Sequence, residues 1–406
     1  MSKKSTMTYE VTVQAPAAAV YHAFTNQTAL TQWLCNNAQV SAQVGDTLFL
    51  TWNQSNYYAV GEFTKLKENK RIAFTWRGRG EPGETAVQIK LEETDDATHI
   101  TLKHKQIGKG NGWKFTRKQI DEGWSSSLAN LKQVLETGLD RRIYERPFLG
   151  ILIGGLVSAE EAKTLGLDIE GGVRITGTMP ETGAAAAGLQ NQDIITSLDD
   201  TPLITFPAIQ SVLSQRKPGD VLATEFYRDG NKHTANLTLT KRPAPNVPDK
   251  PAELAEQLRS QYTTLAADLD DIVANASEEE ASHPNDDQWS AKEILAHLIT
   301  SERGMHMAIA SNMDGNTLNG WPNNPRAWTK AYTEVYTFAA MADAFKHALD
   351  ETLAIVANLP DELVARKATY FGVAQTLFGF AGHVRNHYPE MQQAIDAARA
   401  KETVVE

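Results

Sequence analysis

Residues 289–299 read W-S-A-K-E-I-L-A-H-L-I, and residues 382–388 read G-H-V-R-N-H-Y. Apolar residues recur every three or four positions in and around both stretches, which predicts amphipathic helices. Moving outward, the same spacing predicts four long helices, at about 252–274, 291–312, 327–357 and 374–400. Four helices joined by short or medium connections form an antiparallel bundle, so we expect an all-α domain in the last third of the chain.

Three histidines on these helices are candidate metal ligands. His383 and His387 are four residues apart and therefore share one helix face. His297 lies on another helix, from which a third imidazole can reach the same point. Imidazole nitrogen is a ligand for Zn²⁺, Ni²⁺ and Fe²⁺, so the pattern predicts a three-histidine site for a divalent transition metal (Zn, Ni or Fe). Glu302, five residues after His297, receives no role.

Other features of the sequence argue against several classes of protein. The H-V-R-N-H run lacks the glutamate of H-E-x-x-H, so protease chemistry is not supported. Residues 246–406 carry 12 Lys+Arg against 24 Asp+Glu, a net charge of −12 that argues against a nucleic-acid partner. We expect no membrane span, because no apolar run reaches about 18 residues. A single cysteine and the lack of a signal peptide predict a cytoplasmic protein.

Residues 1–140 show a mixed α and β pattern. Strand-like runs at 46–52, 58–66, 71–76, 86–92 and 98–104 follow two short helical patterns, and a longer helix is expected over 121–136. The runs T-A-L-T-Q-W, V-G-D, G-E-F-T-K-L, I-A-F-T-W and the late G-W resemble the activator of heat-shock-protein-90 ATPase-like branch of the START/polyketide-cyclase (SRPBCC) superfamily. That resemblance implies an α+β helix-grip domain, which often surrounds an apolar cavity.

Tryptophans are concentrated in this first segment. Five of them are candidates to line a cavity for a small apolar ligand: Trp33, Trp52, Trp76, Trp113 and Trp124. The alternative is that they are core residues, as buried aromatic side chains usually are. His22, His99 and His104 are scattered along the segment, and we expect them at the surface.

Residues 141–243 combine Gly and Pro punctuation with short apolar runs, a pattern typical of a mostly-β domain. The ordered runs F-L-G-I, A-A-A-A-G-L-Q-N-Q-D-I-I, K-P-G-D and Y-R-D-G resemble a PDZ domain of the kind attached to high-temperature-requirement serine proteases. The resemblance implies that a partner protein's C-terminus or a peptide adds as a strand to a sheet edge. It also places carboxylate capture at four residues: Phe148, Leu149, Gly150 and Ile151. The groove could instead dock a neighbouring domain or the chain's own tail.

A proline-rich linker, 244–251, separates this domain from residues 252–406. The helical segment resembles the DinB-like four-helix bundles, and the three metal positions of that family match His297, His383 and His387. Thiol-dependent transferases and isomerases belong to the same superfamily, so the resemblance also implies possible metal-dependent chemistry.

Three functional interpretations remain open from the sequence. The first is a multidomain binding or adaptor protein with a ligand cavity, a peptide groove and a metal site. The second is a metal-dependent thiol S-transferase, with the bundle as the catalytic domain and no catalytic side chain identified. The third, a co-chaperone, rests on fold analogy of the first domain alone. A metal with an open coordination position beside a pocket for a thiol would favour the enzyme.

Overall fold

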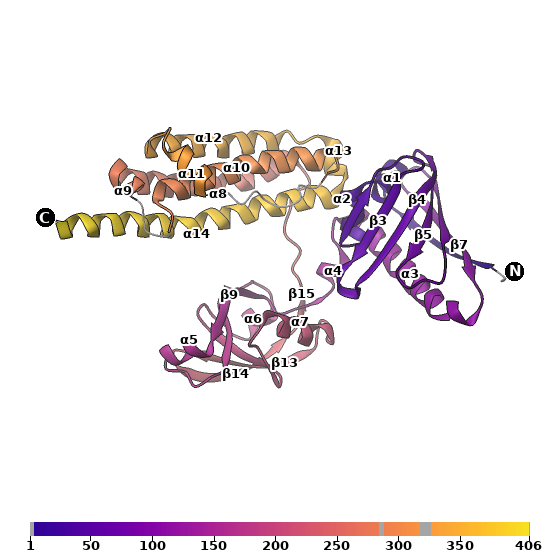
Figure 1. Ribbon diagram of the computed structural model, residues 1–406, viewed down its shortest axis with the longest axis horizontal. Helices are drawn as coiled ribbons and strands as arrows, with labels where there is room; N and C mark the ends of the chain where they lie inside the picture. Colours follow the sequence, from indigo (N-terminus) through magenta and orange to yellow (C-terminus); the bar gives the residue numbers. More distant parts are fainter. Residues whose placement is uncertain (1–3, 284–287, 317–325, 406) are drawn as a thin grey trace. The chain divides into compact units, whose positions relative to one another are not determined.

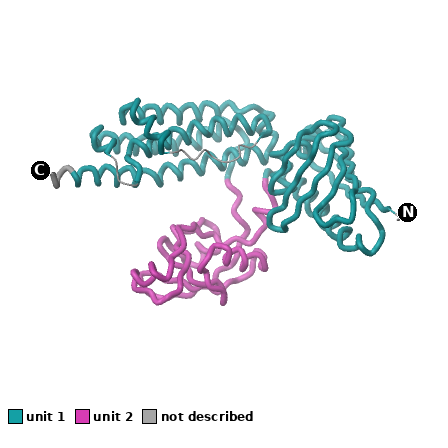
Figure 2. Tube along the Cα trace, in the orientation of Figure 1, with its two compact units in different colours: residues 1–138, 246–406 teal, residues 139–245 magenta. Residues whose placement is uncertain are grey.

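The computed structural model describes residues 4–283, 288–316 and 326–405. The chain divides into two compact units, one formed by 1–138 with 246–406 and the other by 139–245 (Figure 2). The predicted combination of an α+β helix-grip domain, a mostly-β domain and a helical bundle is confirmed (Figure 1).

The N-terminal domain is one antiparallel sheet with helices packed on it. The seven strands follow the order β1-β7-β6-β5-β4-β3-β2. The elements are β1 (Lys4–Val13), α1 (Ala17–Thr25), α2 (Gln27–Trp33), β2 (Asn37–Val40), β3 (Thr47–Trp52), the 3₁₀ turn η1 (Asn53–Ser55), β4 (Tyr57–Lys67), β5 (Arg71–Gly78), β6 (Thr85–Glu93), β7 (Thr98–Gly108), the 3₁₀ turn η2 (Asn111–Trp113) and α3 (Lys114–Thr137). Apolar residues of α3, such as Leu128 and Leu131, share one buried core with the sheet residues Phe63 and Ile100. The sheet therefore grips α3, as the expected fold requires.

Helix α3 begins earlier than the sequence pattern indicates. The apolar spacing predicts 121–136, whereas α3 begins at Lys114. In residues 114–120 the two large apolar side chains, the exposed Phe115 and the buried Ile120, are five positions apart, so they do not mark one helix face. The C-terminal end agrees with the prediction: Gly138 adopts φ +79°, the left-handed conformation in which glycine terminates a helix.

The second unit contains the β-domain. Its elements are α4 (Arg141–Tyr144), β8 (Pro147–Phe148), β9 (Ile151–Ser158), α5 (Ala159–Thr164), β10 (Gly171–Thr178), α6 (Gly183–Ala186), β11 (Ile194–Leu198), β12 (Thr201–Pro202), α7 (Phe206–Ser214), β13 (Val221–Arg228), β14 (Asn231–Thr238) and β15 (Thr240–Lys241). The main sheet runs β14-β13-β11-β10-β9, with β12 on β11, while β15 pairs with β8. Strand β9 is thus at an edge of the sheet.

The C-terminal domain is the helical bundle. Its elements are α8 (Pro251–Ala274), α9 (Glu278–Ser282), α10 (Ala291–Met313), α11 (Arg326–Thr333), α12 (Phe338–Ala357), α13 (Asp361–Ala365) and α14 (Lys367–Val405). Helix α8 packs on α12 and α14, and α10 packs on the same two helices, so the four long helices enclose one core (Figure 1). A capping box begins α10: the Ser290 side chain accepts from the Glu293 N–H, and the Glu293 side chain accepts from the Ser290 N–H.

Two helix boundaries in the bundle differ from the prediction. The pattern at 327–357 is two helices, because Thr337 caps a new helix start by accepting from the backbone N–H of Ala340. The pattern at 374–400 belongs to a longer helix that begins at Lys367 and contains Pro389. Within the described residues, no helix has the length and apolar character needed to cross a membrane.

Candidate functional site

The structure brings His297, His383 and His387 together in the bundle. Helix α10 carries His297, and α14 carries the other two on one face. One ring nitrogen from each imidazole lies within 4.8 Å of the others. All three side chains are half-buried, so they are packed by the bundle and still reach solvent. The helical i, i+4 spacing and the packing of α10 against α14 together create the cluster.

The distances in this cluster suit a metal ion. The Nε2 atoms of His297 and His383 are 3.1 Å apart. Two nitrogens bound to one tetrahedral zinc at ~2.05 Å are separated by about 3.3 Å. His387 Nδ1 lies 2.7 Å from the Glu390 carboxylate. A carboxylate only accepts, so in neutral His387 this nitrogen carries the proton and Nε2 keeps its lone pair for a metal.

The surroundings of His297 and His383 also favour the neutral, ligating form of the imidazole. Burial, followed by the neighbouring His387 and His383, lowers the pKa of His297 to about 4, against a smaller opposing effect of the Glu390 carboxylate. Burial, followed by His387, likewise lowers the pKa of His383. Neutral imidazole is the form that binds metal, so the residues present fit a divalent transition ion with three nitrogen ligands.

Glu302 was given no role from the sequence, yet it is fully buried in the bundle core. Its Oε1 accepts a very short hydrogen bond from the Thr352 hydroxyl, which also contacts His306 Nε2 at 2.7 Å. Its Oε2 and the Tyr262 hydroxyl are buried without a hydrogen-bond partner. Burial raises the pKa of Glu302 to about 7. No pattern in the sequence indicates this group, because a glutamate on a helix is ordinarily solvated.

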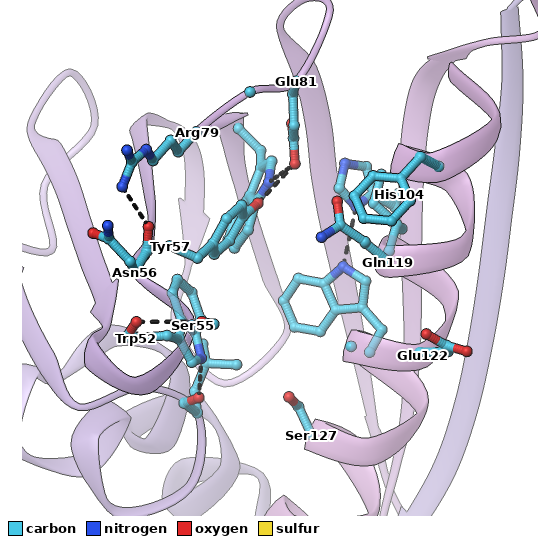
Figure 3. Close-up of a pocket in the computed structure, with 17 residues that line it drawn as sticks. Trp52, Ser55, Asn56, Tyr57, Arg79, Glu81, His104, Gln119, Glu122 and Ser127 are labelled. Atoms are coloured by element: carbon cyan, nitrogen blue, oxygen red, sulfur yellow. Dashed lines mark hydrogen bonds between the residues drawn. The ribbon is translucent and has the colours of Figure 1, made fainter. Parts of the chain in front are cut away.

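The N-terminal domain contains a pocket of about 710 Å³ between its sheet and α3. Of the five candidate tryptophans, Trp52, Trp76 and Trp124 line it (Figure 3). Trp33 lies in the core, 1% exposed, and donates to the Ala23 carbonyl. Trp113 packs its indole against the backbone of Gly108.

His104 also lines this pocket, and the expectation that it is a surface residue is wrong. It is fully buried on β7, and burial lowers its pKa to about 4. Trp124 Nε1 donates to His104 Nδ1 at 3.0 Å, so the ring proton sits on Nε2, which faces Thr85 Oγ1 at 2.7 Å. Because strand β7 alternates inward and outward residues, His104 falls on the inward side with Ile100 and Leu102.

The four residues expected to capture a peptide carboxylate form the connection from β8 to β9. Leu149 is buried, and Gly150 adopts φ +87°. A Cβ at Gly150 would lie 2.0 Å from Thr182 Oγ1, so this position admits only glycine without rearrangement. Phe148 pairs with Thr240 in the small sheet. Ile151 begins the edge strand β9, whose Leu152, Ile153 and Leu156 side chains are exposed.

Three segments of the chain match known protein families. Residues 14–136 match the family described as Activator of Hsp90 ATPase homolog 1-like protein. Residues 152–239 match the PDZ domain, and residues 261–391 match the DinB superfamily.

The chain is also similar to curated proteases over part of its length. The serine protease Do-like HtrA of Lactococcus lactis is 35% identical over 29% of this chain and 29% of its own length. The periplasmic pH-dependent serine endoprotease DegQ of Escherichia coli is 35% identical over 23% of this chain and 21% of its own length. The chain thus spans less than a third of these curated relatives.

Among solved structures, an HSP90 activator from Plasmodium falciparum is 25% identical, covering 32% of this chain and 96% of that chain with a TM-score of 0.28. The Aha1 dimer from Colwellia psychrerythraea is 23% identical with the same coverage and TM-score. By the three family matches, the chain joins an Aha1-like domain of the SRPBCC type, a PDZ domain and a DinB-like domain, in that order.

Proposed function

We propose that this protein is a cytoplasmic multidomain binding protein whose bundle holds one divalent transition metal, zinc, nickel or iron, at His297, His383 and His387. The carrying observation is the convergence of three imidazole nitrogens within 4.8 Å from two helices. The His387–Glu390 contact supports it, because metal-bound histidines usually place their second nitrogen against a carboxylate or carbonyl.

In the same proposal the PDZ domain recruits a protein C-terminus or peptide, and the N-terminal pocket takes a small apolar ligand. The exposed apolar edge of β9 supports strand addition, which supplies affinity through main-chain hydrogen bonds. The 710 Å³ of the pocket lies within the range of about 300–1,000 Å³ usual for small-molecule sites.

Metal content tests the central claim. The purified full-length protein should retain close to one transition-metal ion per chain, measured by inductively coupled plasma mass spectrometry after dialysis. His383→Ala should lose the metal, whereas His347→Ala should keep it, because His347 is an exposed side chain on α12. Equal metal content in the wild type and His383→Ala would contradict the proposal.

The second candidate is a metal-dependent thiol S-transferase. The observation in its favour is that the three clustered imidazoles are half-buried, and three protein ligands would leave at least one coordination position for water or substrate. A metal bound there would lower the pKa of a coordinated thiol. His297, His383 and His387 would hold the ion, and Glu390 would orient His387. Zinc-loaded protein incubated with low-molecular-weight thiols and an electrophile tests this: metal-dependent thiol loss absent from His383→Ala would favour the enzyme.

A further inference from the structure

The Glu81 carboxylate lines the N-terminal pocket, and two pocket side chains hold it in place. It lies on the turn between β5 and β6 and hangs over the cavity (Figure 3). Its Oε1 accepts from the Tyr57 hydroxyl at 2.7 Å and from Trp76 Nε1 at 3.2 Å. Its Oε2 is buried and has no hydrogen-bond partner. Both hydrogen bonds come from neutral groups, so they hold the carboxylate at the pocket wall without adding a compensating positive charge.

The turn is shaped around this carboxylate. A Cβ at Gly78 would lie 1.9 Å from the Tyr57 hydroxyl and 2.4 Å from Glu81 Oε1, so only glycine leaves room for the pair. Gly80 adopts φ +78°, a left-handed conformation that lets the chain reverse direction in the turn that carries Glu81. The position of the carboxylate is therefore fixed by the backbone of the turn.

Aromatic rings surround the space in front of Glu81. The ring of Trp76 lies 6.1 Å from that of Trp52 and 5.8 Å from that of Trp124, measured between centroids, and Tyr57 lies 5.3 Å from Trp52. The negative faces of such rings attract cations.

The hydrogen-bond donors of these rings are already engaged. Trp52 donates to the Leu34 carbonyl at 2.7 Å, Trp76 and Tyr57 donate to Glu81, and Trp124 donates to His104. An anionic ligand would therefore meet ring faces and a carboxylate oxygen rather than these N–H and O–H groups.

The other charged groups that line the pocket do not reverse this preference for a cation over an anion. Arg79 and Glu122, which also line the pocket, are both exposed and opposite in sign. His104 is held neutral by the Trp124 N–H directed at its Nδ1. The carboxylate of Glu81 is thus the charge that a ligand deep in this pocket would meet.

We propose that the pocket binds an organic cation, an amine or quaternary ammonium attached to an apolar body. The cationic head lies among Trp52, Trp76 and Trp124 beside the Glu81 carboxylate, and the apolar body extends toward Ile120 and the exposed ring of Phe115. This inference rests on the proposed ligand-binding role of the N-terminal domain and names the class of ligand.

Three probes with the same body and different heads test the proposal: 4-phenylbutylamine, 4-phenylbutanol and 4-phenylbutanoate. Binding to the full-length protein is followed by tryptophan fluorescence and by isothermal titration calorimetry at pH 7. The amine should bind at least ~10-fold more tightly than the alcohol, and the carboxylate should bind most weakly, because a charge-assisted contact and a cation–π contact are both available only to the amine.

Glu81→Gln keeps the shape of the side chain and removes the charge. This variant should weaken the affinity for the amine ~10-fold and leave the affinity for the alcohol unchanged. Glu84→Gln is the matched control, because Glu84 is exposed on the same turn outside the pocket. Glu84→Gln removes one negative charge, as Glu81→Gln does, and should change the affinity for neither the amine nor the alcohol. Circular dichroism and melting temperature establish that both variants are folded.

The outcomes distinguish a failure of the cation preference from a failure of the proposed ligand-binding role. If the alcohol binds as tightly as the amine, or Glu81→Gln leaves the amine affinity unchanged in a folded protein, the cation preference is wrong and the ligand-binding pocket survives. If none of the three probes binds at millimolar concentration, both the cation preference and the proposed ligand-binding role of this domain are overturned.

Discussion

The Nε2 atoms of His297 and His383 lie 3.1 Å apart, although 86 residues separate them in the chain. One belongs to α10 and the other to α14, so their separation is set by the packing of two long helices rather than by a local turn. A pair held in this way is preorganised for a shared ion, because little side-chain freedom remains to be lost when the ion binds.

Removing one histidine should therefore weaken metal binding steeply. His297→Ala leaves His383 and His387, which cannot fill the remaining coordination shell, and we expect a loss of affinity of at least ~100-fold. Competition with a chromogenic zinc chelator measures the change. His347→Ala, an exposed histidine of α12, is the control and should bind zinc as the wild type does. Wild-type affinity in His297→Ala would exclude His297 as a ligand.

Metal affinity should also fall in acid. Only neutral imidazole binds, and the folded protein lowers the pKa of His297 to about 4 and that of His383 below its usual value. A lowered pKa means that protons compete less well, so affinity should hold below the ordinary histidine pKa of about 6.5 and fall as the pH approaches 4. Zinc titrations between pH 4 and 8 test this. An affinity independent of pH would argue against histidine ligands.

The cluster of three histidines could be predicted because its signal is periodic. His383 and His387 share a face at any helical geometry, and the flanking apolar residues identify α10 and α14 as neighbours in one core. Most strands of the N-terminal domain were predictable for the same reason, since alternation marks their buried side, but the short strand β2 was not predicted. Boundaries were harder, because at the start of α3 the exposed Phe115 and the buried Ile120 do not mark one helix face.

The burial of polar residues could not be read from the pattern. His104 and Glu302 are isolated polar residues in sequence, and each becomes significant only through partners distant in the chain, Trp124 for one and Thr352 for the other. Among the tryptophans, the choice between core and pocket likewise depends on tertiary packing: Trp33 is enclosed by the core, whereas Trp124 borders open space. These distinctions require the three-dimensional arrangement.

Peptide binding by the PDZ domain should depend on a free C-terminus and on Gly150. Amidation of a bound peptide should weaken binding at least ~10-fold in fluorescence polarisation, because the carboxylate is the group expected to be captured at 148–151. Gly150→Ala should abolish binding, since its Cβ would collide with Thr182. Gly188→Ala is a matched control: its φ is also positive, +75°, but its Cβ would meet open space. Equal affinity for amidated and free peptides would contradict carboxylate capture.

Glu302 should make the bundle less stable as the pH rises. Burial raises its pKa to about 7, from an ordinary 4.5, so between these values the folded protein holds a proton that the unfolded chain has released. The stabilisation is fully present below pH 4.5 and is lost as the pH rises through about 7. A change of about 2.5 pH units corresponds to on the order of 3 kcal/mol.

Glu302→Gln removes this titration while keeping a neutral side chain that can still accept from Thr352. Relative to the wild type, the variant should be close to unchanged at pH 4.5 and more stable at pH 8, by up to about 3 kcal/mol in the free energy of unfolding of the bundle. Calorimetry of the full-length protein in EDTA, at several values between pH 4.5 and 8, keeps metal binding out of the comparison. Glu279→Gln, an exposed change on α9, should follow the wild type at every pH. If Glu302→Gln shows the same pH dependence as the wild type, Glu302 is ionised in the folded protein and the raised pKa is wrong.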